Sequence, residues 1–235
     1  MSTARTPWDA ALRELGPGRW PAYLTAHSGL PGPRANLTLV AAAAGRADAA
    51  TIGELLADGG EYPATCAAAA LGRRAADPGC EADARALAAD DRWRVREGVA
   101  LGLQLLGDTD PGALLAVVSR WSADADPLVR RAAVAAICEP RLLRSPDAAA
   151  AAVAVCRRAT QWLAALPDEH RRRPGVRTLR QALGYCWSVA VAADPGPGLA
   201  VFRDLDTSDP DVAWIVQRNR TKKRLSSLLR DERPR

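Results

Sequence analysis

The chain has 235 residues, of which 48% are apolar, 25% are charged and 5% are aromatic, and its formal net charge is +5. These values exclude a disordered polyelectrolyte and a collagen-like chain, and they are ordinary for a folded globular protein. No basic leader followed by an apolar run opens the chain, and no stretch approaches the roughly 20 apolar residues of a membrane span. We therefore expect a cytoplasmic protein without a membrane partner.

Alanine is unusually frequent, and the only lysines among the basic residues are Lys222 and Lys223. Alanine is the strongest helix former, and no segment has the pattern of a strand, so an all-α protein is predicted. The breaks at Pro, Gly and Asp predict helices over residues 7–15, 19–27, 33–45, 48–58, 62–76, 81–89, 92–107, 110–123, 127–139, 146–166, 174–193, 196–205 and 210–224. The bias toward arginine over lysine reflects a coding preference, so arginine abundance alone is weak support for a nucleic-acid partner.

We expect one continuous domain over residues 1–235. The hairpins within residues 1–60 match the later ones poorly, and we interpret them as an N-terminal cap. Residues 166–173 join two long helices and form the most irregular segment. Residues 226–235 are expected to form a disordered tail.

One phrase of sequence recurs along the chain. Residues 126–133 read DPLVRRAA, and partial copies lie around Val95, Val176 and Val212. Between Val95, Val129, Val176 and Val212 the successive intervals are 34, 47 and 36 residues. These intervals bracket the period of about 40 residues that is typical of stacked helical hairpins. The phrase therefore predicts a stack of hairpins, with one insertion in the stretched interval.

Each part of the phrase has a structural interpretation. Asp126 and Asp209 each precede a proline, which is the pattern of a helix N-cap with proline at the first helical position. The valine and the small residues after it share one helix face and predict a packing seam. The arginine after the valine is Arg96, Arg130 or Arg177, and we expect it to bond carbonyls or aspartates of neighbouring turns.

Residues 126–136 and 94–100 resemble the second helix of HEAT repeats, in which Asp, Val-Arg and a following Ala are the hallmark. The resemblance covers the chain from about Arg92 to Leu225. It implies a right-handed α-solenoid of five to six hairpins whose second helices line a concave binding surface. On that surface the candidate binding residues are Glu97, Gln104, Arg131, Thr178, Tyr185, Trp214 and Arg218.

The chain also resembles bacterial DNA glycosylases that remove alkylated purines and are built from HEAT-like repeats. Trp93 and Glu97 lie one helical turn apart and share a face. With Trp187, they resemble the tryptophans and acidic residue of that family, which implies that the rings stack on the lesion and the carboxylate stabilises positive charge on the sugar. The chain departs from the family in having Glu97 where the family has Asp. In the alternative interpretation, Trp93 simply packs at the start of its helix.

Two basic clusters are candidate phosphate contacts, and both also fit solvated surface charge. The first consists of Arg171, Arg172 and Arg173 with Arg177 and Arg180, and the second of Arg218, Arg220, Lys222, Lys223 and Arg224. His27 and His170 have no second ligand at metal-binding spacing, so no metal is predicted. No Gly-rich loop predicts a nucleotide cofactor, and no cofactor is expected.

These patterns favour a non-catalytic scaffold that binds a macromolecular partner, foremost a protein, along its concave face. The alternative is a HEAT-fold DNA-binding protein or glycosylase excising alkylated purines, with Trp93, Glu97 and Trp187 in the catalytic site. Trp214 is the strongest single candidate for partner contact, because its register matches that of Glu97 and Arg131.

Overall fold

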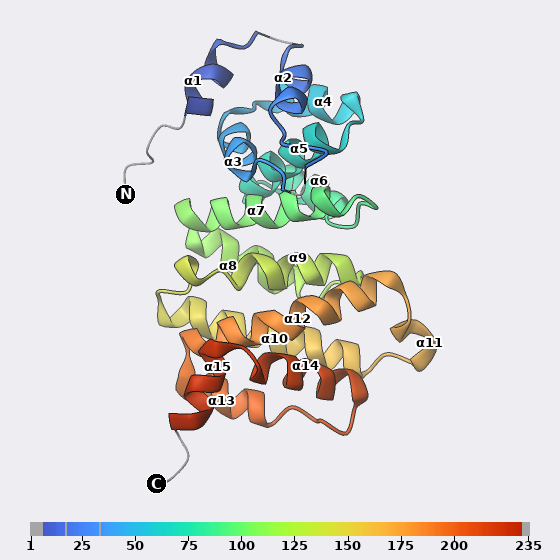
Figure 1. Cartoon of the computed structure of the whole chain (residues 1–235), viewed down its shortest axis with the longest axis vertical. Helices are drawn as coiled ribbons and strands as arrows, with labels where there is room; N and C mark the ends of the chain where they lie inside the picture. Colours follow the sequence, from blue (N-terminus) through green and yellow to red (C-terminus); the bar gives the residue numbers. More distant parts are fainter. Residues whose placement is uncertain (1–6, 17, 33, 232–235) are drawn as a thin grey trace. The chain divides into compact units, whose positions relative to one another are not determined.

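The structure is a computed structural model, and it describes residues 7–16, 18–32 and 34–231. The regular elements in these residues are all helices, which confirms the prediction of an all-α protein (Figure 1). The chain divides into two compact units with the boundary between Thr109 and Asp110. The expectation of a single domain over residues 1–235, with a cap over 1–60, stays a prediction.

Unit 1 contains seven of the described helices. They are α1 (Pro7–Glu14), α2 (Trp20–Ala26), α3 (Leu37–Arg46), α4 (Ala49–Asp58), α5 (Glu61–Arg73), α6 (Pro78–Leu87) and α7 (Trp93–Thr109). Every residue of α5 from Tyr62 to Gly72 is buried, and α5 packs against α3, α4, α6 and α7. This helix is the centre of the unit 1 core.

Unit 2 contains the remaining described helices. They are α8 (Pro111–Trp121), α9 (Pro127–Ile137), the short 3-10 helix η1 (Pro140–Leu142), α10 (Pro146–Ala164), α11 (Asp168–Arg171), α12 (Pro174–Ala193), α13 (Pro195–Arg203), α14 (Pro210–Arg220) and α15 (Lys223–Asp231). The central helix is α12, which contacts α9, α10, α13, α14 and α15.

The helix ends follow the capping residues that the sequence predicted. The Asp126 carboxylate accepts a hydrogen bond from the Leu128 amide at 2.7 Å, and Asp209 accepts from the amides of Asp211 and Val212. In each case a proline occupies the first turn. The Asp-Pro pairs therefore begin helices as expected, because the side chain satisfies backbone donors that the first turn leaves free.

Two expectations at the C-terminal end were wrong. The helix predicted over 210–224 is interrupted after Arg220, and α15 then extends into the segment 226–235 that was expected to be disordered. Leu225 is fully buried, and α15 contacts α12 and α14, so its apolar side holds it on the core. Residues 232–235 lie outside the described residues.

The valines of the repeated phrase form part of the core in both units. Val95, Val129, Val176 and Val212 are each at most 3% exposed. In unit 1, the small residues after Val95 allow α7 to approach α5 at backbone distance. A Cβ atom at Gly98 would lie 2.5 Å from the Thr65 carbonyl oxygen, and one at Gly102 would overlap the Ala69 carbonyl oxygen. The predicted packing seam is therefore confirmed there.

The arginines of the phrase behave as predicted at two positions of three. Arg96 donates to the carbonyl oxygens of Asp90 and Asp91, and the buried Arg130 donates to that of Ser122. Arg177 is exposed instead, so the expectation for it was wrong. None of the helices in the described residues is both long and apolar enough to cross a membrane.

Candidate functional site

In unit 2, α12 and α14 are joined by the fully buried side chain of Asn219. Its Nδ2 donates to the carbonyl oxygens of Leu183 at 2.9 Å and Ile215 at 2.8 Å, and its Oδ1 accepts from the Ser188 amide at 2.8 Å. Leu183 and Ser188 contribute backbone groups of α12, so one side chain of α14 bonds to two points of the α12 backbone. This clamp sets the position of α14 along α12.

Trp214 lies against α12 one turn before that clamp. A Cβ atom at Gly184 would be only 2.7 Å from the Trp214 ring, so the absence of a side chain at this position makes room for the indole. The guanidinium of Arg180 lies over the ring, 4.6 Å from its centroid, and that of Arg218 lies 5.8 Å away. Trp214 is half-buried, and it positions two arginines beside the junction of α12 and α14.

Arg171 belongs to an internal ion-pair network. Its guanidinium is 2.6 Å from Asp209 and 3.5 Å from Asp211, and it also donates to the carbonyl oxygens of Ala164 and Leu166. The carboxylate of Asp209 raises the pKa of Arg171. Asp211 is shared with Arg180. Arg171 thus uses most of its donors within the fold, and its contact with phosphate stays a prediction.

Tyr185 has an open ring between two cations. It is 46% exposed on α12, with the ammonium of Lys222 5.6 Å and the guanidinium of Arg224 5.4 Å from the ring centroid. Arg224 also donates a hydrogen bond to the Tyr185 hydroxyl at 3.1 Å. These cations are farther from the Tyr185 ring than Arg180 is from the Trp214 ring, and the residue keeps nearly half of its accessible surface.

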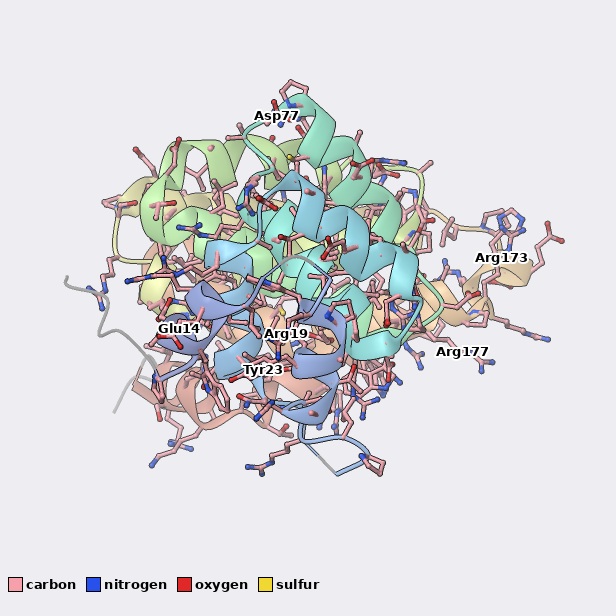
Figure 2. The ribbon with its side chains drawn as sticks, turned by 90° about the horizontal axis from the view of Figure 1, so that it is seen from above. Glu14, Arg19, Tyr23, Asp77, Arg173 and Arg177 are labelled. Carbon is pink, nitrogen blue, oxygen red and sulfur yellow. The ribbon has the colours of Figure 1, made fainter. Side chains whose placement is uncertain are left out.

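An exposed line of side chains on α12 leads to this ring. Arg173, Arg177, Gln181 and Tyr185 are spaced four residues apart, and all four are exposed. Figure 2 shows Arg173 and Arg177 extending outward. We call this line, together with Arg218, Lys222 and Arg224, the Tyr185 strip.

The charged side chains of the Tyr185 strip are all positive. It contains five cations, Arg173, Arg177, Arg218, Lys222 and Arg224. The sequence of α12 has no acidic residue, and the only one in α14 is Asp211, which is already bonded to Arg171 and Arg180. The strip therefore presents a positive field that no unpaired carboxylate of α12 or α14 neutralises.

The other predicted residues of unit 2 are distributed around the strip. Arg172 and Lys223 are exposed beside it, and Arg131 is half-buried on α9. The Thr178 hydroxyl donates to the Pro174 carbonyl oxygen at 3.0 Å. The structure thus brings Tyr185, Trp214 and Arg218 together with Lys222 and Arg224.

Trp187 is a core residue, which corrects its assignment to a catalytic site. It is fully buried, its indole nitrogen donates to the Thr160 hydroxyl at 3.0 Å, and its ring centroid is 5.6 Å from that of Phe202. A ring enclosed in this way has no face left to stack on a nucleobase.

In unit 1, Trp93 is 53% exposed at the start of α7, and the Arg94 guanidinium lies 4.5 Å from its ring centroid. Arg94 also forms a 2.9 Å ion pair with Glu61. Glu97 and Gln104 are half-buried on the same helix. Because about half of the Trp93 side chain is exposed, it is not enclosed by packing at the start of α7, as the alternative interpretation in the sequence analysis expected.

Sequence reasoning included Arg177 in the first basic cluster, but it missed Gln181 as a member of the surface, and it missed Asn219. The four-residue spacing from Arg173 to Tyr185 was a usable signal for Gln181. In contrast, a single Asn in a helix carries no signal that distinguishes a buried clamp from a surface residue.

The sequence matches no protein-family model, no curated protein and no solved structure. Within the described residues, no three His, Cys, Asp or Glu side chains gather in a way that could hold a metal ion. The chemistry of the Tyr185 strip is therefore the basis on which function is inferred.

Proposed function

We propose that the chain is a non-catalytic HEAT-type scaffold, a right-handed α-solenoid of five to six hairpins, that binds a negatively charged macromolecular partner through the Tyr185 strip. The buried valines, the Asp-Pro helix starts and the carbonyl-bonding arginines Arg96 and Arg130 support the HEAT-type architecture. One observation carries the binding function: an exposed tyrosine has two cations beside its ring and a line of further exposed cations leading to it. The only acidic side chain of α12 and α14, that of Asp211, is already paired.

A cytoplasmic location is part of this proposal. No cysteine within the described residues forms a disulfide, and Cys66, Cys138, Cys156 and Cys186 are buried. Cysteines without disulfides are typical of reducing compartments. Burial also raises the pKa of Cys66, which disfavours the reactive thiolate form and fits a packing role.

Polyanion binding tests the proposed function. The probes are fluorescent polyglutamate of 15 residues and inorganic polyphosphate of similar length, titrated at several salt concentrations. The strip variant carries Arg177→Gln, Arg218→Gln and Lys222→Gln. We expect it to bind at least about tenfold more weakly than wild type and to show a smaller dependence on salt. Each cation that contacts the polyanion releases counterions on binding, so a variant with fewer contacts releases fewer of them.

A matched control separates the strip from net charge. Arg13, Arg144 and Arg157 are also exposed, and replacing all three by Gln removes the same charge from other places. This control is expected to bind nearly as tightly as wild type. An equal loss in both variants, or no polyanion binding by wild type at low salt, contradicts the proposal.

A DNA glycosylase that excises alkylated purines is the second candidate. The observation that favours it is the exposed Trp93, one helical turn before Glu97. Incubation with methylated duplex DNA, followed by measurement of the purine released, tests it. Release that Glu97→Gln abolishes without weakening DNA binding would support a glycosylase over a scaffold.

A further inference from the structure

We infer that the partner is a single-stranded nucleic acid and that one of its bases stacks on Tyr185. This inference rests on the proposed function, whose binding surface it shares. Tyr185 is 46% exposed, and the cations of Arg224 and Lys222 lie over its ring, 5.4 and 5.6 Å from the centroid. Aromatic rings interleaved with basic residues are the arrangement that binds single strands, because bases stack on the rings while cations contact the phosphates.

The two aromatic residues near the junction of α12 and α14 have different roles. Trp214 is half-buried, its ring edge fills the space at Gly184, and Arg180 lies 4.6 Å from its centroid. These contacts fix the position of the Trp214 ring, and the ring in turn holds Arg180 and Arg218 in place. Tyr185 is the ring that remains open to a ligand.

The hydrogen bond from Arg224 holds the Tyr185 ring by its hydroxyl. A ring held at one edge loses less conformational freedom on binding than a freely rotating one. The guanidinium of Arg224 has five donors, so a cation that is bonded to the hydroxyl still has N–H groups to offer to a phosphate.

The exposed line on α12 offers contacts to the phosphates of a bound strand along its length. Arg173, Arg177, Gln181 and Tyr185 extend over twelve residues, which is about 18 Å along a helix axis. The first two offer cations, and Gln181 offers an amide that both donates and accepts hydrogen bonds. The line therefore presents charge toward one end and a stacking surface at the other.

The exposed Tyr185 ring favours a single-stranded nucleic acid over an acidic peptide or a duplex. An acidic peptide would use the arginines and leave the Tyr185 ring without a matching group. The bases of a duplex are stacked on each other, so a duplex would contact only the cations. A single strand uses both the cations and the ring.

A pair of oligonucleotides isolates the stacking contribution. Fluorescence anisotropy is measured with a 15-nucleotide oligothymidylate and with an abasic oligomer of the same length and phosphate charge. We expect wild type to bind the oligothymidylate about tenfold more tightly, since the loss of one stacked base typically weakens binding by about this factor or more. Tyr185→Leu is expected to bind both oligomers equally, whereas Tyr185→Phe keeps most of the preference.

Tyr23→Leu is the matched control, because it removes a partly exposed tyrosine ring from α2, outside the strip and outside both candidate sites. It should retain the tenfold preference. Circular dichroism of each variant confirms that the helices are intact. If Tyr185→Leu keeps the preference for oligothymidylate, the stacking assignment is overturned.

Comparison with other polyanions separates this inference from the proposed function. If polyglutamate or a 15-base-pair duplex binds more tightly than oligothymidylate and the strip variant weakens that binding, the single-strand assignment is overturned while the proposed function stands. If wild type binds none of the probes at low salt, both fail.

Discussion

The α5–α7 pair of unit 1 and the α12–α14 pair of unit 2 use opposite means to hold two helices together. In unit 1 the contact is made by backbone, with Gly72, Gly98 and Gly102 removing the side chains that would keep the helices apart. In unit 2 the contact is made by side chains: Asn219 bonds to the α12 backbone, and Trp214 fills the space at Gly184.

The difference shows how packing determines what a helix pair can offer to a partner. Glycine contacts bring the backbones together and leave few side-chain atoms at these points of the junction. The Asn219 clamp and the Trp214 ring instead bring Arg180, Arg218 and the neighbouring Tyr185 to the surface of the junction. We therefore expect variants of the first pair to change stability, and variants of the second pair to change both stability and binding.

The largest effect is expected for Gly102→Ala. The new methyl group would overlap the Ala69 carbonyl oxygen and lie 2.9 Å from the Arg73 amide nitrogen, so α5 and α7 must separate. We expect a loss of about 3 kcal/mol in the free energy of unfolding, measured by urea denaturation. Gly53→Ala in α4 is the control, because a Cβ atom there meets no neighbour. It should stabilise the protein by about 0.5–1 kcal/mol, and equal losses in the two variants would refute the close-packing explanation.

Asn219→Ala tests the clamp of the second pair. It leaves the Ser188 amide and the Leu183 carbonyl without their side-chain partner in a buried position, so we expect a loss of about 2–3 kcal/mol. Gln217→Ala changes an exposed neighbour on the same helix and should alter stability by less than about 0.5 kcal/mol. The clamp variant should also weaken polyanion binding. Unchanged stability would show that the clamp contributes little to holding α14.

Arg171→Met tests the ion-pair network that leads into the same pair. The variant removes the hydrogen bonds to Asp209 and to the carbonyl oxygens of Ala164 and Leu166, so a loss of roughly 2 kcal/mol is expected. Arg172→Met, at the exposed next position, is the control and should be nearly neutral. Thermal and urea unfolding of both variants provide the comparison. Loss of polyanion binding in Arg172→Met alone would instead extend the binding surface to this residue.

The smallest effect concerns Asp90, just before α7 in unit 1. Hydrogen bonds from the Arg92 guanidinium and amide lower the pKa of Asp90 below its ordinary value of about 3.9. The charged form therefore stabilises the fold above about pH 4, and this contribution is lost as the pH falls through the lowered folded-state pKa. Asp90→Asn should cost about 1 kcal/mol at pH 7, with the gap from wild type narrowing as the pH falls below about 4. A gap that is the same at pH 7, 5 and 3 would show that the charge is not involved.

The sequence predicted the parts of the fold that depend on local chemistry. Asp126 and Asp209 begin helices because an aspartate before a proline satisfies backbone donors within its own turn. Val95 and Val129 are buried because helical spacing places them on the packed face. Residues of this kind are predictable since their partners lie within a few positions of the chain.

The parts that were not predicted depend on distant partners. Trp187 is buried because Thr160 and Phe202, on other helices, enclose it. Arg171 is occupied because Asp209 lies beside it, 38 positions further along the chain. The candidate site was predicted as separate pieces, with Tyr185 in one set and Lys222 and Arg224 in another. Only the fold shows that the cations flank the ring.

The Asn219 clamp has a consequence for hydrogen exchange. The Ser188 amide lies in the middle of α12, yet it donates to a side chain of α14. When α14 moves away, this amide loses that bond while α12 can remain helical. Its exchange rate therefore reports the opening of the α12–α14 pair, and a ligand on the Tyr185 strip should slow exchange at Ser188 more than at other α12 amides. The exchange rate of the Ser188 amide therefore measures how often α14, and with it part of the binding surface, separates from α12.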